Sequence, residues 1–266
     1  MTSPDRPSGT GAGVSAANSR PALWRGDTPW FHRYVTHAPK LRLICFPHAG
    51  GTAAFFRPWA GRLPADVELV AVQYPGRQDR LKEPVPASIE DLADIVAGHL
   101  DPLLDLSVAL FGHSMGASIA YEVARRIEAH CDLRLLFVSG SVAPGGGPPG
   151  EEHLLHDEEL IHCTVERGGP NSDAYQVPAL RPLLMPSLRA DRRLVDTYRP
   201  VRVPVLRTAV VAFGGDADQG CPPEKLQTWQ EVSPKPLDTH VFPGGHFYLH
   251  GQEDQVVGQI IDRLIG

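Results

Sequence analysis

Short apolar runs alternate with helical patterns along most of this chain. Runs with the length and composition of buried strands occur at residues 41–46, 67–73, 108–111, 133–139, 208–213 and 239–242. Between these runs, apolar residues recur at helical spacing, most clearly over residues 89–103, 115–127 and 253–264. Because strands that alternate with helices pair in parallel, the pattern predicts an α/β fold, with a mostly parallel sheet flanked by helices on both faces.

The alternation stops between about residues 145 and 200. A linker rich in glycine and proline, residues 144–150, leads into helical stretches over 154–167 and 179–198, and prolines 182 and 186 interrupt the second stretch. The leucines of that stretch are expected to pack against another apolar surface, because they are too apolar to remain exposed. We therefore predict a helical insertion that forms a lid over the site of chemistry, the alternative being an ordinary pair of surface helices.

The N-terminal residues, the overall composition and the net charge narrow the range of functions that the sequence allows. Residues 1 to about 27 lack apolar periodicity and are expected to be a disordered tail, which leaves one domain over residues 28–266. An aromatic patch near Trp30 and Tyr34 is expected to pack on that domain. No stretch resembles a membrane span or a secretory signal, so we expect a cytoplasmic protein without a membrane partner. The net charge of −6 and the lack of a long basic run argue against nucleic acid.

Four widely spaced cysteines form no Cys-x-x-Cys pair, so the sequence predicts no metal site. Monomer is the default expectation for the oligomeric state.

The sequence GHSMG at residues 112–116 lies between an apolar run and a helical pattern. This is the context of a nucleophile elbow, in which a sharp turn holds a serine beside the first N–H groups of a helix. A chain with 26 glycines can produce such a match by chance, so the prediction of an elbow rests mainly on the apolar run before it and the helical pattern after it. We predict Ser114 as the nucleophile and the backbone N–H of Met115 as one oxyanion donor.

Two loops after early strands add candidate residues. The strand at 41–46 ends in PHAGG at residues 47–51, where α/β-hydrolases place the second oxyanion donor, here the N–H of Ala49. The alternative is a glycine turn with His48 packing locally. After the strand at 67–73, Arg77 and Arg80 could meet a phosphate, but we favour a structural role in which ion pairs hold the loop.

A serine hydroxyl needs a neutral base, and a carboxylate must orient that base. The hydrolase order is serine, acid, histidine, each after a strand. Among the 12 histidines, His246 fits because a strand and a Gly-Gly turn precede it. Asp216 and Asp218 both follow the strand at 208–213, and spacing alone only favours Asp218, which lies further into the loop.

The combination of motifs resembles the type II thioesterases, the stand-alone α/β-hydrolases that accompany polyketide and nonribosomal peptide synthetases. The matching segments are residues 46–51, 74–77, 112–116, 188–191 with Tyr198, 215–218 and 243–247. The resemblance runs from about Trp30 to the last residue. It implies an α/β-hydrolase fold with a lid, Asp218 as the acid of a Ser114–His246–Asp218 triad, and Ala49 and Met115 as oxyanion donors.

The resemblance also implies a task. Members of this family hydrolyse stalled or wrongly primed acyl groups from the phosphopantetheine arm of an acyl or peptidyl carrier protein, with no metal or organic cofactor of their own. Other functions stay open from the residues alone. These are a cytosolic carboxylesterase with the same triad, a non-catalytic binding protein, which an intact triad disfavours, and an acyltransferase or product-releasing enzyme.

Overall fold

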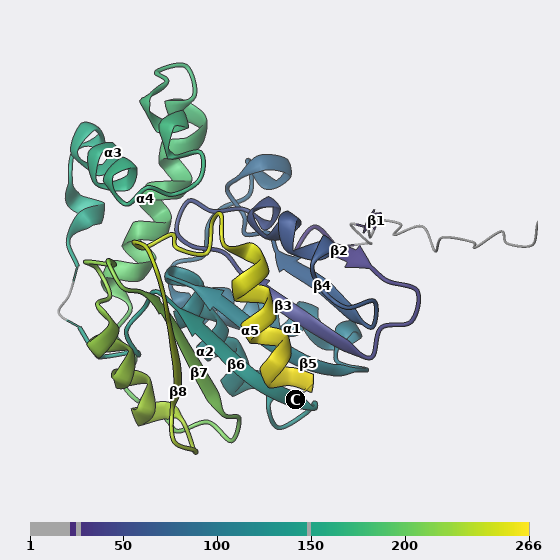
Figure 1. Ribbon diagram of the computed structural model, residues 1–266. Coiled ribbons are helices and arrows are strands. Elements are labelled where there is room, and N and C mark those ends of the chain that lie inside the picture. The colour runs from purple at the N-terminus through teal and green to yellow at the C-terminus, as the bar shows by residue number, and fades with distance from the viewer. Residues whose placement is uncertain (1–21, 25–27, 148–149, 266) are drawn as a thin grey trace, which may run out of the picture.

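The computed structural model describes residues 22–24, 28–147 and 150–265 of the chain. Its centre is an eight-stranded sheet with the strand order β1-β2-β4-β3-β5-β6-β7-β8. The strands from β3 onwards are parallel, and they are β3 (Leu41–Phe46), β4 (Val67–Val72), β5 (Ser107–His113), β6 (Leu133–Ser139), β7 (Val210–Gly215) and β8 (Asp238–Phe242). All six strands were predicted from the apolar runs, and the α/β fold class is confirmed (Figure 1).

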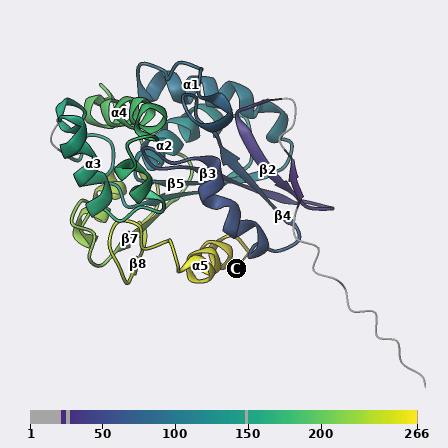
Figure 2. The same ribbon diagram turned by 90° about the horizontal axis from the view of Figure 1, so that it is seen from above.

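Helices cover both faces of the sheet. Successive residues of β3 point to opposite faces, so Ile44 belongs to one core and Leu43 to the other. The first core is covered by α1 (Ile89–Leu100), α2 (Met115–Ile127) and the 3-10 helix η6 (Pro223–Val232). The second lies under η1 (Ala53–Gly61) and α5 (Glu253–Ile265). Figure 2 shows α1 and α2 on one side of the sheet and α5 on the other.

One edge of the sheet differs from the prediction. β2 (Phe31–Val35) pairs antiparallel with β4, and β1 (Ala22–Trp24) pairs antiparallel with β2. The aromatic patch does pack on the domain, but as part of a strand, in which Arg33 also bonds the buried Glu68 of β4 at 2.7 Å. The expected disordered tail, residues 1–27, was wrong at residues 22–24, which form β1; the rest of that expectation falls on residues 1–21 and 25–27, which lie outside the described part of the chain.

A helical insertion lies between β6 and β7, where the sequence predicted one. It consists of η4 (Glu152–Leu154), α3 (Asp157–Glu166), η5 (Ser172–Gln176) and α4 (Arg181–Thr197), and Figure 1 shows α3 and α4 beyond one end of the strands. The predicted interruption of α4 was wrong. Pro182 lies in the first turn, where a missing N–H is harmless, and the helix continues past Pro186 because Leu188 and Leu194 are fully buried.

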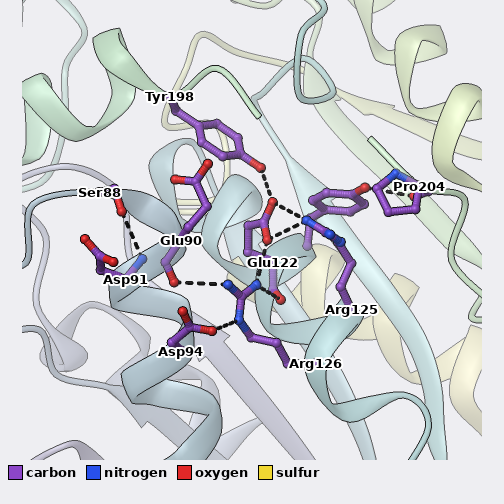
Figure 3. A network of polar contacts seen from close by, with 10 residues as sticks. Ser88, Glu90, Asp91, Asp94, Glu122, Arg125, Arg126, Tyr198 and Pro204 are labelled. Atoms are coloured by element: carbon purple, nitrogen blue, oxygen red, sulfur yellow. Dashed lines mark hydrogen bonds and ion pairs between the residues drawn. The ribbon is translucent and has the colours of Figure 1, made fainter. Parts of the chain in front are cut away.

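The end of α4 is attached to α2 by a buried carboxylate, that of Glu122 (Figure 3). Glu122 accepts hydrogen bonds from the Tyr198 hydroxyl at 2.7 Å and from Arg125 and Arg126 at 2.8 and 2.6 Å. Arg126 also donates to the Glu90 carbonyl of α1 at 3.1 Å. The C-terminal end of α4 is therefore joined directly to α2 and, through Arg126, to α1.

The short 3-10 helices η2 (Gln78–Arg80) and η3 (Asp101–Leu103) complete the fold. Within the described ranges, no helix is both long and apolar enough to cross a membrane.

The packing around Gly116 shows how closely α2 approaches β3. A Cβ atom there would lie 2.0 Å from the Phe46 carbonyl oxygen, whereas a Cβ at the exposed Gly98 of α1 would meet nothing within 4 Å. We expect Gly116→Ala to lower the free energy of unfolding by about 3 kcal/mol through overpacking. Gly98→Ala should raise it by about 1 kcal/mol through helix propensity. Urea unfolding followed by circular dichroism measures both, and equal stabilities would contradict the packing.

Candidate active site

Ser114 lies in the turn between β5 and α2 with a strained backbone, at φ 56° and ψ −120°. Two hydrogen bonds hold the turn, from the Ser114 N–H to the Ser139 carbonyl at 2.7 Å and from the Ala117 N–H to the Ser114 carbonyl at 2.9 Å. Glycine is needed at position 112, because a Cβ there would lie 2.1 Å from the Gly116 carbonyl oxygen. This is the geometry of a nucleophile elbow, and it leaves Ser114 half-buried at the end of the strand.

The loop after β3 presents a second backbone donor. The Gly51 N–H donates to the His48 carbonyl at 2.9 Å, which fixes the peptide between His48 and Ala49. Since N–H and C=O of one peptide point in opposite directions, the Ala49 N–H is directed away from that bond. Neither this N–H nor that of Met115 donates to any residue that the structure describes. Both predicted oxyanion donors are therefore available to a ligand.

The structure brings His246 and Asp218 together. His246 Nδ1 lies 2.7 Å from Asp218 Oδ2, and Asp218 Oδ1 accepts from the N–H groups of Gly220 and Cys221 at 2.9 and 3.2 Å. Burial raises the pKa of the Asp218 carboxyl, but the His246 hydrogen bond and charge and the two backbone donors outweigh it and lower that pKa below its ordinary value. Asp218 is thus an ionised partner that orients the imidazole.

Asp216 has a different position, which spacing alone could not establish. It is exposed, and its Oδ1 accepts from the Gly244 N–H at 2.8 Å, so it holds the loop that precedes His246.

The structure places His246 beside the residue that precedes the nucleophile in the chain. The ring of His113, next to Ser114 in the chain, lies 5.0 Å from the ring of His246 between centroids. Among the described residues, Ser114 Oγ forms no hydrogen bond with His246. Such contacts are often loose without a substrate and tighten when one binds.

Two further histidines lie near His246: the ring of His113 packs against it, and the ring of His48 packs against His113. Sequence reasoning assigned no role to His113. Burial, followed by the charge of His246, lowers the pKa of His48 to about 3 and that of His113 well below its ordinary value. His113 Nδ1 lies 2.9 Å from Ser139 Oγ, which is 2.6 Å from the Tyr248 hydroxyl. Both rings are therefore neutral at pH 7 and add no positive charge that would oppose an imidazolium at His246.

The active site of an α/β-hydrolase consists of a serine on an elbow, two free N–H groups and an Asp–His pair, all at the carboxyl ends of parallel strands. The site described above has each of these groups. An α/β-hydrolase is therefore the class of protein which the fold and the site define.

Comparison with known proteins gives the family. The sequence matches the thioesterase domain family over residues 41–264. It is 36% identical over 241 residues to thioesterase PikA5 of Streptomyces venezuelae, covering 89% of this chain and 85% of PikA5. The chain belongs to the thioesterase family and is a thioester hydrolase.

Solved structures agree. The type II thioesterase BorB from the borrelidin biosynthetic cluster matches with a TM-score of 0.82 and 39% identity, over 88% of this chain and 97% of that one. YbtT, a type II thioesterase from the yersiniabactin NRPS/PKS pathway, matches with a TM-score of 0.77 and 27% identity, over 86% and 95% of the two chains. The resemblance to type II thioesterases stated from the motifs is confirmed.

The two aspartates offer a matched test of the site. We expect Asp218→Asn to lower kcat roughly 10⁴-fold, because the amide stabilises the wrong tautomer of His246 and cannot stabilise the imidazolium. Asp216→Asn keeps an oxygen that can accept from Gly244 and should retain most activity. Hydrolysis of an acyl thioester, followed by release of the thiol, measures both variants. Comparable losses in the two would contradict the assignment of Asp218.

Proposed function

We propose that this thioesterase removes stalled or wrongly primed acyl groups from the phosphopantetheine arm of an acyl or peptidyl carrier protein. The observation that carries the proposal is the Asp218–His246 pair, 2.7 Å apart, beside an elbow serine and two free N–H groups. The NRPS/PKS pathway of YbtT and the biosynthetic cluster of BorB support the choice of substrate. We also propose a cytoplasmic location, where such synthetases work.

In the proposed mechanism His246 accepts the Ser114 proton while Oγ attacks the thioester carbonyl carbon. The N–H groups of Ala49 and Met115 stabilise the tetrahedral oxyanion. The C–S bond then breaks, His246 returns the proton to the leaving sulfur, and an acyl-serine remains. His246 next deprotonates water, which attacks the acyl-serine; the acid is released and the proton passes back to Ser114. This sequence uses no metal or organic cofactor, because the phosphopantetheine belongs to the carrier protein.

The insertion supports a covered site. The space beside the α-carbon of Gly50, in the oxyanion loop, is filled by Tyr175 of η5 and Leu188 of α4. The α-carbon of Gly169 is covered in the same way by the ring of Phe247, next to the proposed base. We propose that the insertion acts as the lid over the acyl chain.

The first test is hydrolysis of an acyl-phosphopantetheinyl carrier protein beside an oxygen ester of the same acyl group. We expect the wild-type protein to remove the acyl mass from the carrier faster than it cleaves the ester, since the thiolate is the better leaving group. Ser114→Ala should abolish both reactions and leave the fold unchanged. Intact mass spectrometry of the carrier gives the readout. A carrier that stays loaded while the ester is cleaved would favour a carboxylesterase.

A further inference from the structure

A buried ion pair joins the insertion to the loop after β4. Both oxygens of Asp191, on α4, bond the guanidinium of Arg77, with Nη1–Oδ2 at 2.6 Å and Nη2–Oδ1 at 2.7 Å. Asp191 is 1% exposed and Arg77 4% exposed. Burying two charges requires removing both from water, and an apolar pair of similar size is often at least as stable. Stability alone therefore does not explain why these two residues are charged.

The same two residues bond the loop that contains Ala49. The Gly50 N–H donates to Asp191 Oδ2 at 2.7 Å, and Arg77 Nη1 donates to the Gly51 carbonyl at 3.1 Å. The loop is thus fixed by two atoms of the pair, directly after the residue that presents the free N–H.

These bonds fix both peptide planes that flank Ala49. The preceding plane is held by the bond from the Gly51 N–H to the His48 carbonyl, and the following plane by the bond from the Gly50 N–H to Asp191. Because a peptide is planar, the first bond sets the direction of the Ala49 N–H. The second bond holds the next peptide and so keeps Gly51 in position to form the first bond. Gly50 has a φ of +75°, so the chain bends sharply here and depends on external contacts to keep one orientation.

We propose that Arg77 and Asp191 are positioning residues for the oxyanion hole, through which α4 of the insertion holds the Ala49 N–H toward the reacting carbonyl. The inference rests on the proposed function in one respect, that Ala49 is an oxyanion donor. It predicts that the pair affects the transition state more than substrate binding.

Two double variants both remove the two buried charges of the pair. They differ only in whether residue 191 offers an oxygen that can accept from the Gly50 N–H. Arg77→Met with Asp191→Leu removes the buried charges together and leaves the Gly50 N–H without an acceptor. Arg77→Met with Asp191→Asn also removes the charges but returns an oxygen to that N–H. We expect the leucine double variant to lose about 100-fold in kcat with KM within about threefold of wild type, as a misplaced donor would cause. The asparagine double variant should recover about 10-fold of that loss.

A second measurement is the affinity for a pantetheine trifluoromethyl ketone, whose adduct with Ser114 places an oxyanion in the hole. Its affinity should fall in parallel with kcat/KM across the variants, whereas the affinity for the matching unreactive thioether should not change. A purely structural role of the pair would not separate the two ligands.

The matched control is Tyr198→Phe. It removes the hydrogen bond to Glu122 that anchors the C-terminal end of α4 (Figure 3) but touches no residue of the oxyanion loop. We expect wild-type kcat and wild-type ketone affinity for this variant. An equal loss in Tyr198→Phe would show that any loosening of α4 is sufficient, and would overturn the specific role of the pair.

If the leucine double variant does not fold, Asp191→Glu decides the question. It keeps the charge opposite Arg77 but moves the carboxylate one bond away from Gly50, so kcat should fall about 10-fold with KM unchanged. Wild-type kcat in Asp191→Glu or in the leucine double variant would overturn the inference while leaving the proposed function intact. A wild-type protein that neither cleaves acyl-carrier protein nor binds the ketone would instead refute the proposed function.

Discussion

The close approach of α2 to the end of β3 is the constraint on which the site depends. Gly116 leaves no room for a side chain, because a Cβ there would lie 2.0 Å from the Phe46 carbonyl oxygen. This contact places the first N–H groups of α2 beside the loop that follows β3, so that the free N–H groups of Met115 and Ala49 belong to one site. It also forces the chain at Ser114 into a backbone conformation that only a tightly packed surrounding can maintain.

The parallel strands and the elbow could be predicted from the sequence because each leaves a local signal. A parallel strand buried on both faces appears as an uninterrupted apolar run, as in residues 41–46. The elbow combines such a run with a helical pattern within about ten residues. His246 could be selected in the same way, from the strand and the turn before it. Its hydrogen bond to Asp218 spans only two adjacent strands, β7 and β8.

Features decided by distant contacts could not be predicted in this way. β2 contains the buried His32 and the ion-paired Arg33, so its apolar alternation is hidden until Glu68 of β4 is placed beside it. The continuity of α4 past Pro186 depends on the burial of its leucines against other parts of the fold. Arg77 was expected to hold its loop by an ion pair, but its partner Asp191 is 114 residues away and belongs to another element.

The contacts of α4 show that this helix is firmly attached to the sheet loops and helices of the α/β-hydrolase fold. It is attached to the oxyanion loop through the buried Arg77–Asp191 pair and to α2 through Glu122 and Tyr198. By contrast, α3 meets α4 through a small apolar cluster and through two ion pairs, Arg181–Glu158 and Arg189–Asp157, whose carboxylates are largely exposed. Exposed pairs contribute little, whereas breaking a buried pair leaves an uncompensated charge. Within the insertion, α4 is therefore fixed beside the oxyanion loop, and α3 is attached to α4 by weaker contacts.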